Sequence, residues 1–197
     1  MGWGSVKVFE KKQQYAIIPI LTYLRETGNL MNGEMYHKGD WIVHKHHGVG
    51  QIRGIEKKTI GGDAQDYFRV KVSEGVYWLP VTQIPEYVRS VASQKKLQKA
   101  LKLIRKAPKP LPSDYKENDR VIAARLADAT LEANGELIRD LFARRHDEQM
   151  RMSAFSERYL TELRKQFLRE MVVVLGVEKD VVRKKLDHAL QVSLSKK

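Results

Sequence analysis

Glycines spaced through residues 39–86 constrain the fold of this 197-residue chain more than any other feature. They separate short runs of β-branched and aromatic residues, the composition of strands: Trp41–Val43, Gly50–Ile55, Tyr67–Val72 and Val76–Leu79. Glycine permits the tight turns of a small, strongly bent sheet, and Ile60–Asp63 has the composition of a hairpin turn. About five strands in fifty residues predict an SH3-like or Tudor-like five-stranded β barrel.

Residues 91–195 have the periodicity of helices instead. Apolar residues recur at helical spacing in five groups: Leu97, Leu101 and Ile104; Val121, Ile122 and Leu126; Leu137, Ile138 and Leu141; Leu160, Leu163, Phe167, Leu168 and Met171; Val181, Val182, Leu186 and Leu190. Short loops between such helices favour a compact all-α bundle of about five helices. The predicted fold class is therefore α+β with two domains, a barrel over residues 36–89 and a helical domain over residues 91–195.

Local signals predict where these helices begin and end. The proline-rich segment 107–112 stops the first, and Asp114 with Glu117 three residues later forms a capping-box pattern that begins the second. Asn134-Gly135 predicts the break before the third. The fourth begins after Ser153 or Ser156 and ends at Gly176.

Residues 1–35 form a leader with no counterpart in either pattern. Its apolar run, Tyr15–Leu24, contains Pro19 and is far shorter than the roughly 20 residues that span a bilayer. No small-residue cleavage site of a secretory signal follows it, so we expect a cytoplasmic protein. Two interpretations of the leader stay open: Met31 or Met35 is the true start and the segment is an artefact, or it is an extension, disordered or loosely packed on the body.

The charge is uneven along the chain. Lys and Arg number 36 against 24 acidic residues, a net charge of +12, and there is no Cys to form a disulfide or a Cys-based zinc site. Residues 36–89 hold 8 basic and 6 acidic residues, whereas residues 90–197 hold 24 and 15. We therefore expect the glycine-rich half to contact protein and the helical half to contact a polyanion, with nucleic acid the first candidate.

Catalytic and metal-binding patterns are weak. His44, His46 and His47 lie near Asp40, but no further strong ligand is close in sequence, so we expect one or two of these histidines to satisfy turn backbone and none to hold zinc. The sequence has no nucleophile elbow or phosphate-binding loop, and Gly48-Val49-Gly50 lacks the third glycine of a dinucleotide site. The prediction is a protein that is not an enzyme and uses no cofactor.

The order of residues in the β region resembles one known family. Gly39-Asp40 is followed by β-branched residues, His44, a basic residue, His47-Gly48, a second glycine, a strand ending in Ile55-Glu56, an aromatic strand and Leu79-Pro80-Val81. This order resembles the RNA-polymerase-interacting domain shared by CarD-like bacterial transcription regulators and transcription-repair coupling factors. Helix number, and Ser156-Glu157-Arg158 opening a long helix, extend the resemblance to about residue 190.

The resemblance implies a transcription regulator of the bacterial cytoplasm, nucleoid-associated and monomeric. Its barrel would bind the β subunit of RNA polymerase, and its helical domain would bind promoter double-stranded DNA at the upstream edge of the bubble, stabilising the open complex. The same stabilisation can activate an unstable promoter or slow escape from a stable one. Coupling factors themselves fit less well, because the chain has no helicase motifs.

The resemblance also assigns residues. Lys58, Trp78 and Arg53 are the expected polymerase contacts, although Trp78 stands where relatives carry a basic residue. Strand alternation puts Trp78 opposite Tyr77 and Leu79, and leaves open which side faces the core.

For DNA, Tyr115 stands at about the position of a Trp wedge in the family, with Lys116, Arg120 and Arg125 following it; Arg120 matches a phosphate contact. An aromatic side chain at this position can still stack on a base.

Two hypotheses of other classes remain beside this one. A standalone, non-specific nucleic-acid-binding protein would bind any duplex with steep salt dependence. A protein–protein adaptor would show no DNA contact. Most basic clusters are interleaved with acids, as on ordinary exposed helix faces. The series Lys95 to Lys109 is the exception and a candidate site, because no acidic residue occurs between Arg89 and Asp114.

Overall fold

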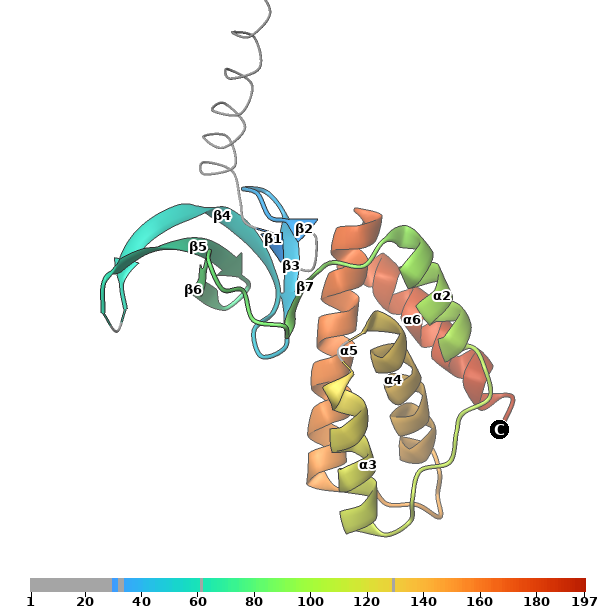
Figure 1. The fold of residues 1–197 in the computed structure, drawn as a ribbon. Coiled ribbons are helices and arrows are strands. Elements are labelled where there is room, and N and C mark those ends of the chain that lie inside the picture. The colour runs from blue at the N-terminus through green and yellow to red at the C-terminus, as the bar shows by residue number, and fades with distance from the viewer. Residues whose placement is uncertain (1–29, 32–33, 61, 129) are drawn as a thin grey trace, which may run out of the picture. The chain divides into compact units, whose positions relative to one another are not determined.

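The structure, a computed structural model, describes residues 30–31, 34–60, 62–128 and 130–197. The leader predicted over residues 1–35 falls largely outside them. The described elements are the strands β1 (Leu30–Met31), β2 (Glu34–Met35), β3 (Trp41–His44), β4 (Gly48–Thr59), β5 (Ala64–Val72), β6 (Gly75–Pro80) and β7 (Val88–Ser90), then the helices α2 (Gln94–Ile104), α3 (Tyr115–Ala127), α4 (Leu131–Arg145), α5 (Ala154–Leu175) and α6 (Lys179–Leu194) (Figure 1).

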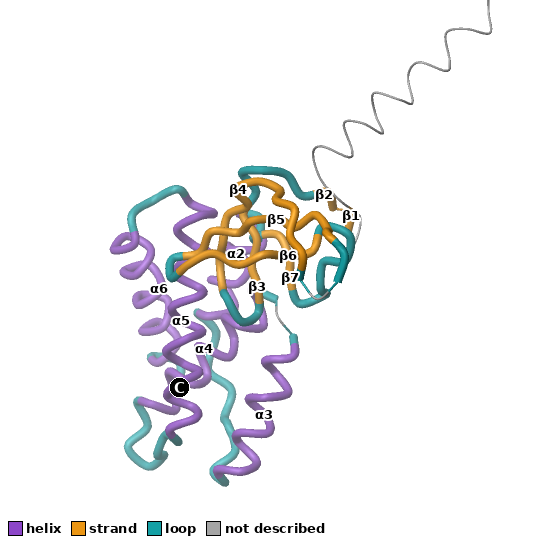
Figure 2. Tube along the Cα trace, turned by 90° about the vertical axis from the view of Figure 1, so that its left-hand side faces the viewer, coloured by secondary structure: helices purple, strands orange, loops and turns teal. Residues whose placement is uncertain are grey.

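Strands β3 to β7 form one antiparallel sheet in the order β6-β5-β4-β3-β7. Figure 2 shows these strands in orange. The predicted α+β class is confirmed in the described part of the chain, with five sheet strands followed by five helices. The sheet is open, with β6 and β7 at its edges. The hairpin turn is also confirmed, because β4 ends at Thr59 and β5 begins at Ala64.

A β-bulge interrupts the longest strand. The register of β4 on β5 shifts between Ile52 and Gly54, so Arg53 is an extra residue on β4. Gly54 has a φ of +155°, a conformation that side chains with a Cβ rarely adopt. The strand bends at this point while Ile52, Phe68 and Val70 remain fully buried in the sheet core.

The chain divides into two compact units. The first, called here the sheet unit, contains the described residues up to Asp40 and Gln51–Pro85; the second, the helical unit, contains Trp41–Gly50 and Glu86–Lys197. The helical unit therefore includes β3 and β7. Within it, buried Glu170 of α5 accepts hydrogen bonds from both terminal nitrogens of Arg89 in β7, at 2.7 and 2.9 Å, and from the Ala92 backbone at 2.8 Å.

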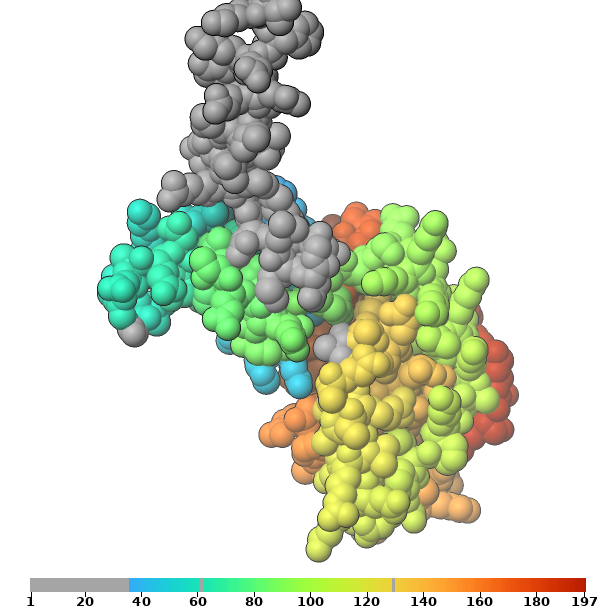
Figure 3. Space-filling view, viewed as in Figure 1, coloured from blue at the N-terminus to red at the C-terminus, as the bar shows by residue number. Residues whose placement is uncertain are grey.

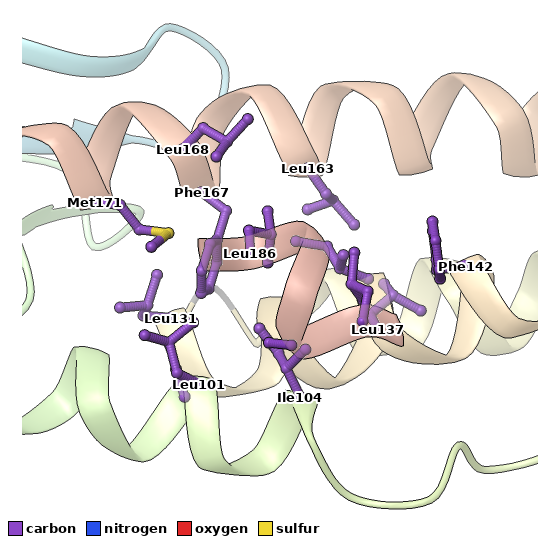
Figure 4. Close-up of a cluster of buried hydrophobic side chains, with 14 of the residues drawn as sticks. Leu101, Ile104, Leu131, Leu137, Phe142, Leu163, Phe167, Leu168, Met171 and Leu186 are labelled. Atoms are coloured by element: carbon purple, nitrogen blue, oxygen red, sulfur yellow. The ribbon is translucent and has the colours of Figure 1, made fainter. Parts of the chain in front are cut away.

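Each helix of the helical unit contributes buried apolar residues to one common core. Figure 4 shows Ile104 of α2, Leu137 of α4 and Phe167 of α5 pointing toward one another. Gly135 corrects the predicted break: it lies inside α4, which begins at Leu131 with Thr130 as its N-cap. A Cβ on Gly135 would lie 3.3 Å from two Ile104 carbons and 3.4 Å from Phe167 Cε2, so this glycine permits helix packing rather than a turn.

Most of the predicted helix boundaries are confirmed. The Asp114 side chain accepts from the Glu117 backbone N–H at the start of α3, and Ser153, not Ser156, is the N-cap of α5. Gly176 ends α5 with a φ of 63°. In α6, Val182 is buried, but Val181 is 51% exposed and does not belong to the predicted apolar face.

Candidate protein-interaction site

Three strands of the sheet unit bring four side chains together on one face. The β5–β6 register pairs Arg69 with Trp78, and β4 supplies Glu56 and Lys58 two residues apart. Because alternate residues of a strand share a face, these positions follow from the hairpin register. We call Glu56, Lys58, Arg69 and Trp78 the Trp78 cluster.

The carboxylate of Glu56 is the centre of this cluster. Trp78 Nε1 donates a hydrogen bond to Glu56 Oε2 at 2.9 Å. Lys58 Nζ lies 3.7 Å from the same oxygen and 4.4 Å from the centroid of the Trp78 ring. Arg69 Nε lies 3.5 Å from Glu56 Oε1. One carboxylate thus orients the indole, and a lysine covers one ring face in cation–π geometry.

The cluster stays open to solvent. Trp78 is 39% exposed, whereas its neighbour Leu79 is 3% exposed. The sequence left open which side of this strand faces the core; in the structure Leu79 faces the core and Trp78 faces solvent. The hydrogen bond from Trp78, followed by the charges of Arg69 and Lys58, lowers the pKa of Glu56. An oriented, exposed aromatic ring flanked by cations is a suitable anchor for a protein partner with apolar and acidic groups.

The edge of the sheet adds a second means of recognition. In the order of the described strands, β6 is an edge strand, and it carries Trp78. An edge strand offers backbone donors and acceptors to an incoming strand independently of sequence. Arg53, the third predicted polymerase contact, is exposed at the bulge, and no interaction joins it to the cluster.

Sequence reasoning found Lys58 and Trp78 but missed Glu56 and Arg69. The sequence did contain a signal for these two residues: the predicted turn at 60–63 sets the pairing of β4, which carries Glu56, with β5, which carries Arg69. The bulge at Arg53 and the β6 register, which the pattern does not specify, complete the arrangement.

The predicted DNA-binding residues lie at the start of α3 in the helical unit. Tyr115 is 48% exposed at the first position of the helix, and Lys116 and Arg120 are exposed one turn apart. Arg125 is placed differently: its Nη1 donates to Asp140 Oδ2 at 2.8 Å, and the Asp140 side chain is fully buried. The structure therefore groups three of the four residues at a surface and commits the fourth to an internal ion pair.

The histidines form a turn rather than a ligand set. His44 Nδ1 accepts the backbone N–H of His46 at 3.0 Å and of His47 at 3.2 Å, which confirms the structural role expected for His44. Burial, then the charges of His47 and His46, lowers the pKa of His44 to about 4. Among the described residues, no three His, Cys, Asp or Glu side chains are grouped to hold a metal ion.

No described helix combines the length and apolar character needed to cross a membrane.

Comparison with known proteins identifies a domain family for the part of the chain that contains this cluster. Residues 36–92 match the family of the CarD-like/TRCF RID domain. This segment is a CarD-like RNA-polymerase-interacting domain. The chain is 38% identical over 66 residues to transcription-repair-coupling factors of Staphylococcus aureus strains USA300 and NCTC 8325, and 36% identical to that of Staphylococcus haemolyticus.

The extent of the match is limited. It covers 33% of this chain and only 6% of each of these relatives. The RID domain spans β3 to β7 and includes the whole Trp78 cluster. The helices beyond residue 92 lie outside the matched family segment.

Proposed function

We propose that this protein is a transcription regulator that binds the β subunit of RNA polymerase through its RID domain. The observation that supports this proposal most directly is the Trp78 cluster. It presents an exposed, oriented aromatic–cation pair on a domain of a polymerase-interacting family. Lys58 and Trp78 are the central contacts, and Arg53 contributes charge at the bulge. The β6 edge adds backbone pairing. This function places the protein in the bacterial cytoplasm, at the nucleoid.

The helical unit then contacts promoter DNA at the upstream edge of the bubble. Tyr115 stacks on a base or leans into the minor groove, while Lys116 and Arg120 contact phosphates. Polymerase binding tethers this weak contact and makes it effectively intramolecular. A contact that favours melted over closed DNA stabilises the open complex by that difference in binding free energy.

The test of the polymerase contact uses the whole chain, because β3 and β7 group with the helices. Affinity for a purified fragment of the polymerase β subunit is measured for the wild type, Lys58→Glu and Lys57→Glu. Lys57 is the matched control: it is exposed on the same strand but alternates to the opposite face. We expect Lys58→Glu to weaken binding at least ~10-fold, about 1.4 kcal/mol, and Lys57→Glu to have little effect. Equal effects of the two reversals, or no binding by the wild type, would refute the proposal.

The DNA contact has a separate test. Base–aromatic stacking contributes about 1–3 kcal/mol, so Tyr115→Ala should shorten the lifetime of open complexes several-fold without changing affinity for the β fragment. Tyr87→Ala is the control, since Tyr87 is similarly exposed, at 43% against 48%. Unchanged open-complex lifetimes with Tyr115→Ala would remove Tyr115 from the mechanism.

A further inference from the structure

One face of α2 carries lysines that the proposed function has not used. Lys95, Lys99, Lys102 and Lys106 follow one another at intervals of four, three and four residues, and all four are exposed. At 3.6 residues per turn these positions fall within an arc of about 60°. Lys106 lies just beyond the helix end and continues the turn, its N–H donating to the Leu103 carbonyl. We call these four residues the lysine stripe.

The opposite face of α2 fixes the orientation of this stripe. Leu97, Leu101 and Ile104 are buried in the core of the helical unit. The helix therefore cannot rotate to cover its lysines without exposing these residues. The stripe is held toward solvent by the packing of the fold.

Its charge is almost uncompensated. No acidic residue occurs between Arg89 and Asp114. Among the described residues, the stripe has a single carboxylate neighbour, Glu132, whose Oε1 lies 3.7 Å from Lys99 Nζ. The Lys99 side chain nevertheless remains 71% exposed. Such a concentration of one charge on one face attracts polyanions.

The surface around Tyr115 is different. The first turns of α3 carry Asp114, Glu117 and Asp119 beside Lys116 and Arg120, so acids outnumber bases there. Tyr115 can stack on a base, but its immediate surroundings repel phosphate as much as they attract it. The contacts of Lys116 and Arg120 with phosphate would therefore add little net attraction to DNA, whereas α2, in a segment without acidic residues, would add more.

The dimensions of the stripe suit a nucleic-acid backbone. Lys95 and Lys102 are seven residues apart, about 10 Å along a helix, which equals roughly three nucleotide steps of one DNA strand. Lysine acts as a flexible point charge and binds phosphate without requiring a fixed geometry. Within the helical unit, α4 lies between α2 and α3 (Figure 1), and α2 forms part of the outer surface (Figure 3).

We propose that the lysine stripe of α2 is a second DNA contact, which binds the phosphates of a duplex backbone without reading sequence and is separate from the contact at Tyr115. This inference rests on the proposed function, because it assumes that the helical unit approaches DNA. It adds the surface that supplies the electrostatic affinity, while Tyr115 supplies the preference for the edge of the bubble.

The experiment measures affinity of the whole chain for a plain duplex over a range of salt concentrations. The test variant is Lys95→Gln/Lys99→Gln/Lys102→Gln. The control, Lys179→Gln/Lys184→Gln/Lys185→Gln, removes the same charge from exposed positions of α6. Each phosphate contact contributes about 0.9 to the slope of log K against log salt concentration. We expect the slope to fall by about 2–3 in the α2 variant and by much less in the α6 variant.

The outcomes separate this inference from the function on which it rests. Equal slopes for the two variants would overturn the stripe as a DNA contact while leaving the polymerase function intact. Loss of binding to the polymerase β fragment in the α2 variant, with duplex binding retained, would also overturn it and identify the stripe as a protein contact. A wild type that binds no duplex even at low salt would refute both the DNA half of the proposed function and the stripe.

Discussion

The Trp78 cluster of the sheet unit and the carboxylate of Asp140 in the helical unit use the same chemistry with opposite consequences. Glu56 holds Trp78, Lys58 and Arg69 at the surface, where Trp78 remains 39% exposed. Asp140 is fully buried and is bound by Arg125 at 2.8 Å, Arg139 at 2.7 Å and the Lys109 backbone N–H at 2.9 Å. One carboxylate holds exposed partners at the surface, and the other is itself buried and binds buried Arg139 and half-buried Arg125.

The comparison shows that a basic residue in a sequence pattern is a candidate contact only if its partner leaves it accessible. An exposed ion pair contributes little to stability, so its residues are available for binding. A buried pair is costly to break, because removing one partner leaves an uncompensated charge in the interior. By this criterion Lys58 is available, and Arg125 has its main role inside the helical unit.

The largest effect is expected at Asp140. Asp140→Asn keeps the shape of the side chain but removes the carboxylate that pairs with Arg125 and leaves buried Arg139 with only Glu136, at 3.6 Å, which should lower the free energy of unfolding by about 3–5 kcal/mol. Urea denaturation measures it. Asp187→Asn is the control, because Asp187 pairs with Arg164 at 2.5 Å but is 45% exposed; its effect should stay below about 1 kcal/mol. Equal losses in the two variants would break the distinction between a buried and an exposed carboxylate.

The next effect concerns pH and His44. Its pKa is lowered to about 4 in the folded state, below the ordinary histidine value of 6.5, so the unfolded chain binds more protons between these values. Stability should be constant with respect to His44 above pH 6.5 and fall by about 2–3 kcal/mol as the pH drops from 6.5 to 4. Protonation at Nδ1 also removes the acceptor of the His46 and His47 N–H groups.

Urea denaturation at several pH values tests this, with His188→Gln as the control, since His188 is exposed. His44→Asn should flatten the dependence between pH 4 and 6.5. A slope identical to that of the wild type would exclude His44 as its source.

The smallest effect on stability is expected at Glu56. Glu56→Ala removes the acceptor of the Trp78 indole N–H and the partner of Lys58 and Arg69, yet every group involved is at least partly exposed. The loss in urea denaturation should be much smaller than that of Asp140→Asn, while affinity for the β fragment falls because the ring is no longer held. A loss of stability as large as that of Asp140→Asn would make the cluster structural rather than a binding surface.

Structural features that depend on neighbouring residues can be predicted from the sequence. Strand runs, the turn at 60–63 and the caps Asp114 and Ser153 depend on a few adjacent positions and were predicted. Long-range features were not. Gly135 looks like a break until Ile104 and Phe167 are placed against it.

The candidate site shows the same limit. Lys58 and Trp78 were found, but the hydrogen bond between Glu56 and Trp78 joins residues 22 positions apart and depends on two strand registers. Arg125 looks like a surface cation because Asp140, its partner 15 residues later, belongs to another helix. The strand β7, only three residues long, is too short to show alternation.

The central claim, that the exposed Trp78 anchors the RID domain on polymerase, is tested most directly by comparing two tryptophans. Trp78 and Trp41 are 39% and 38% exposed, so their truncation removes similar surface from different parts of the sheet. Affinity of the whole chain for the polymerase β fragment should fall by at least ~30-fold in Trp78→Ala, the effect of a binding hot spot of about 2 kcal/mol, and by less than about twofold in Trp41→Ala. Equal affinities of the two variants would contradict the account.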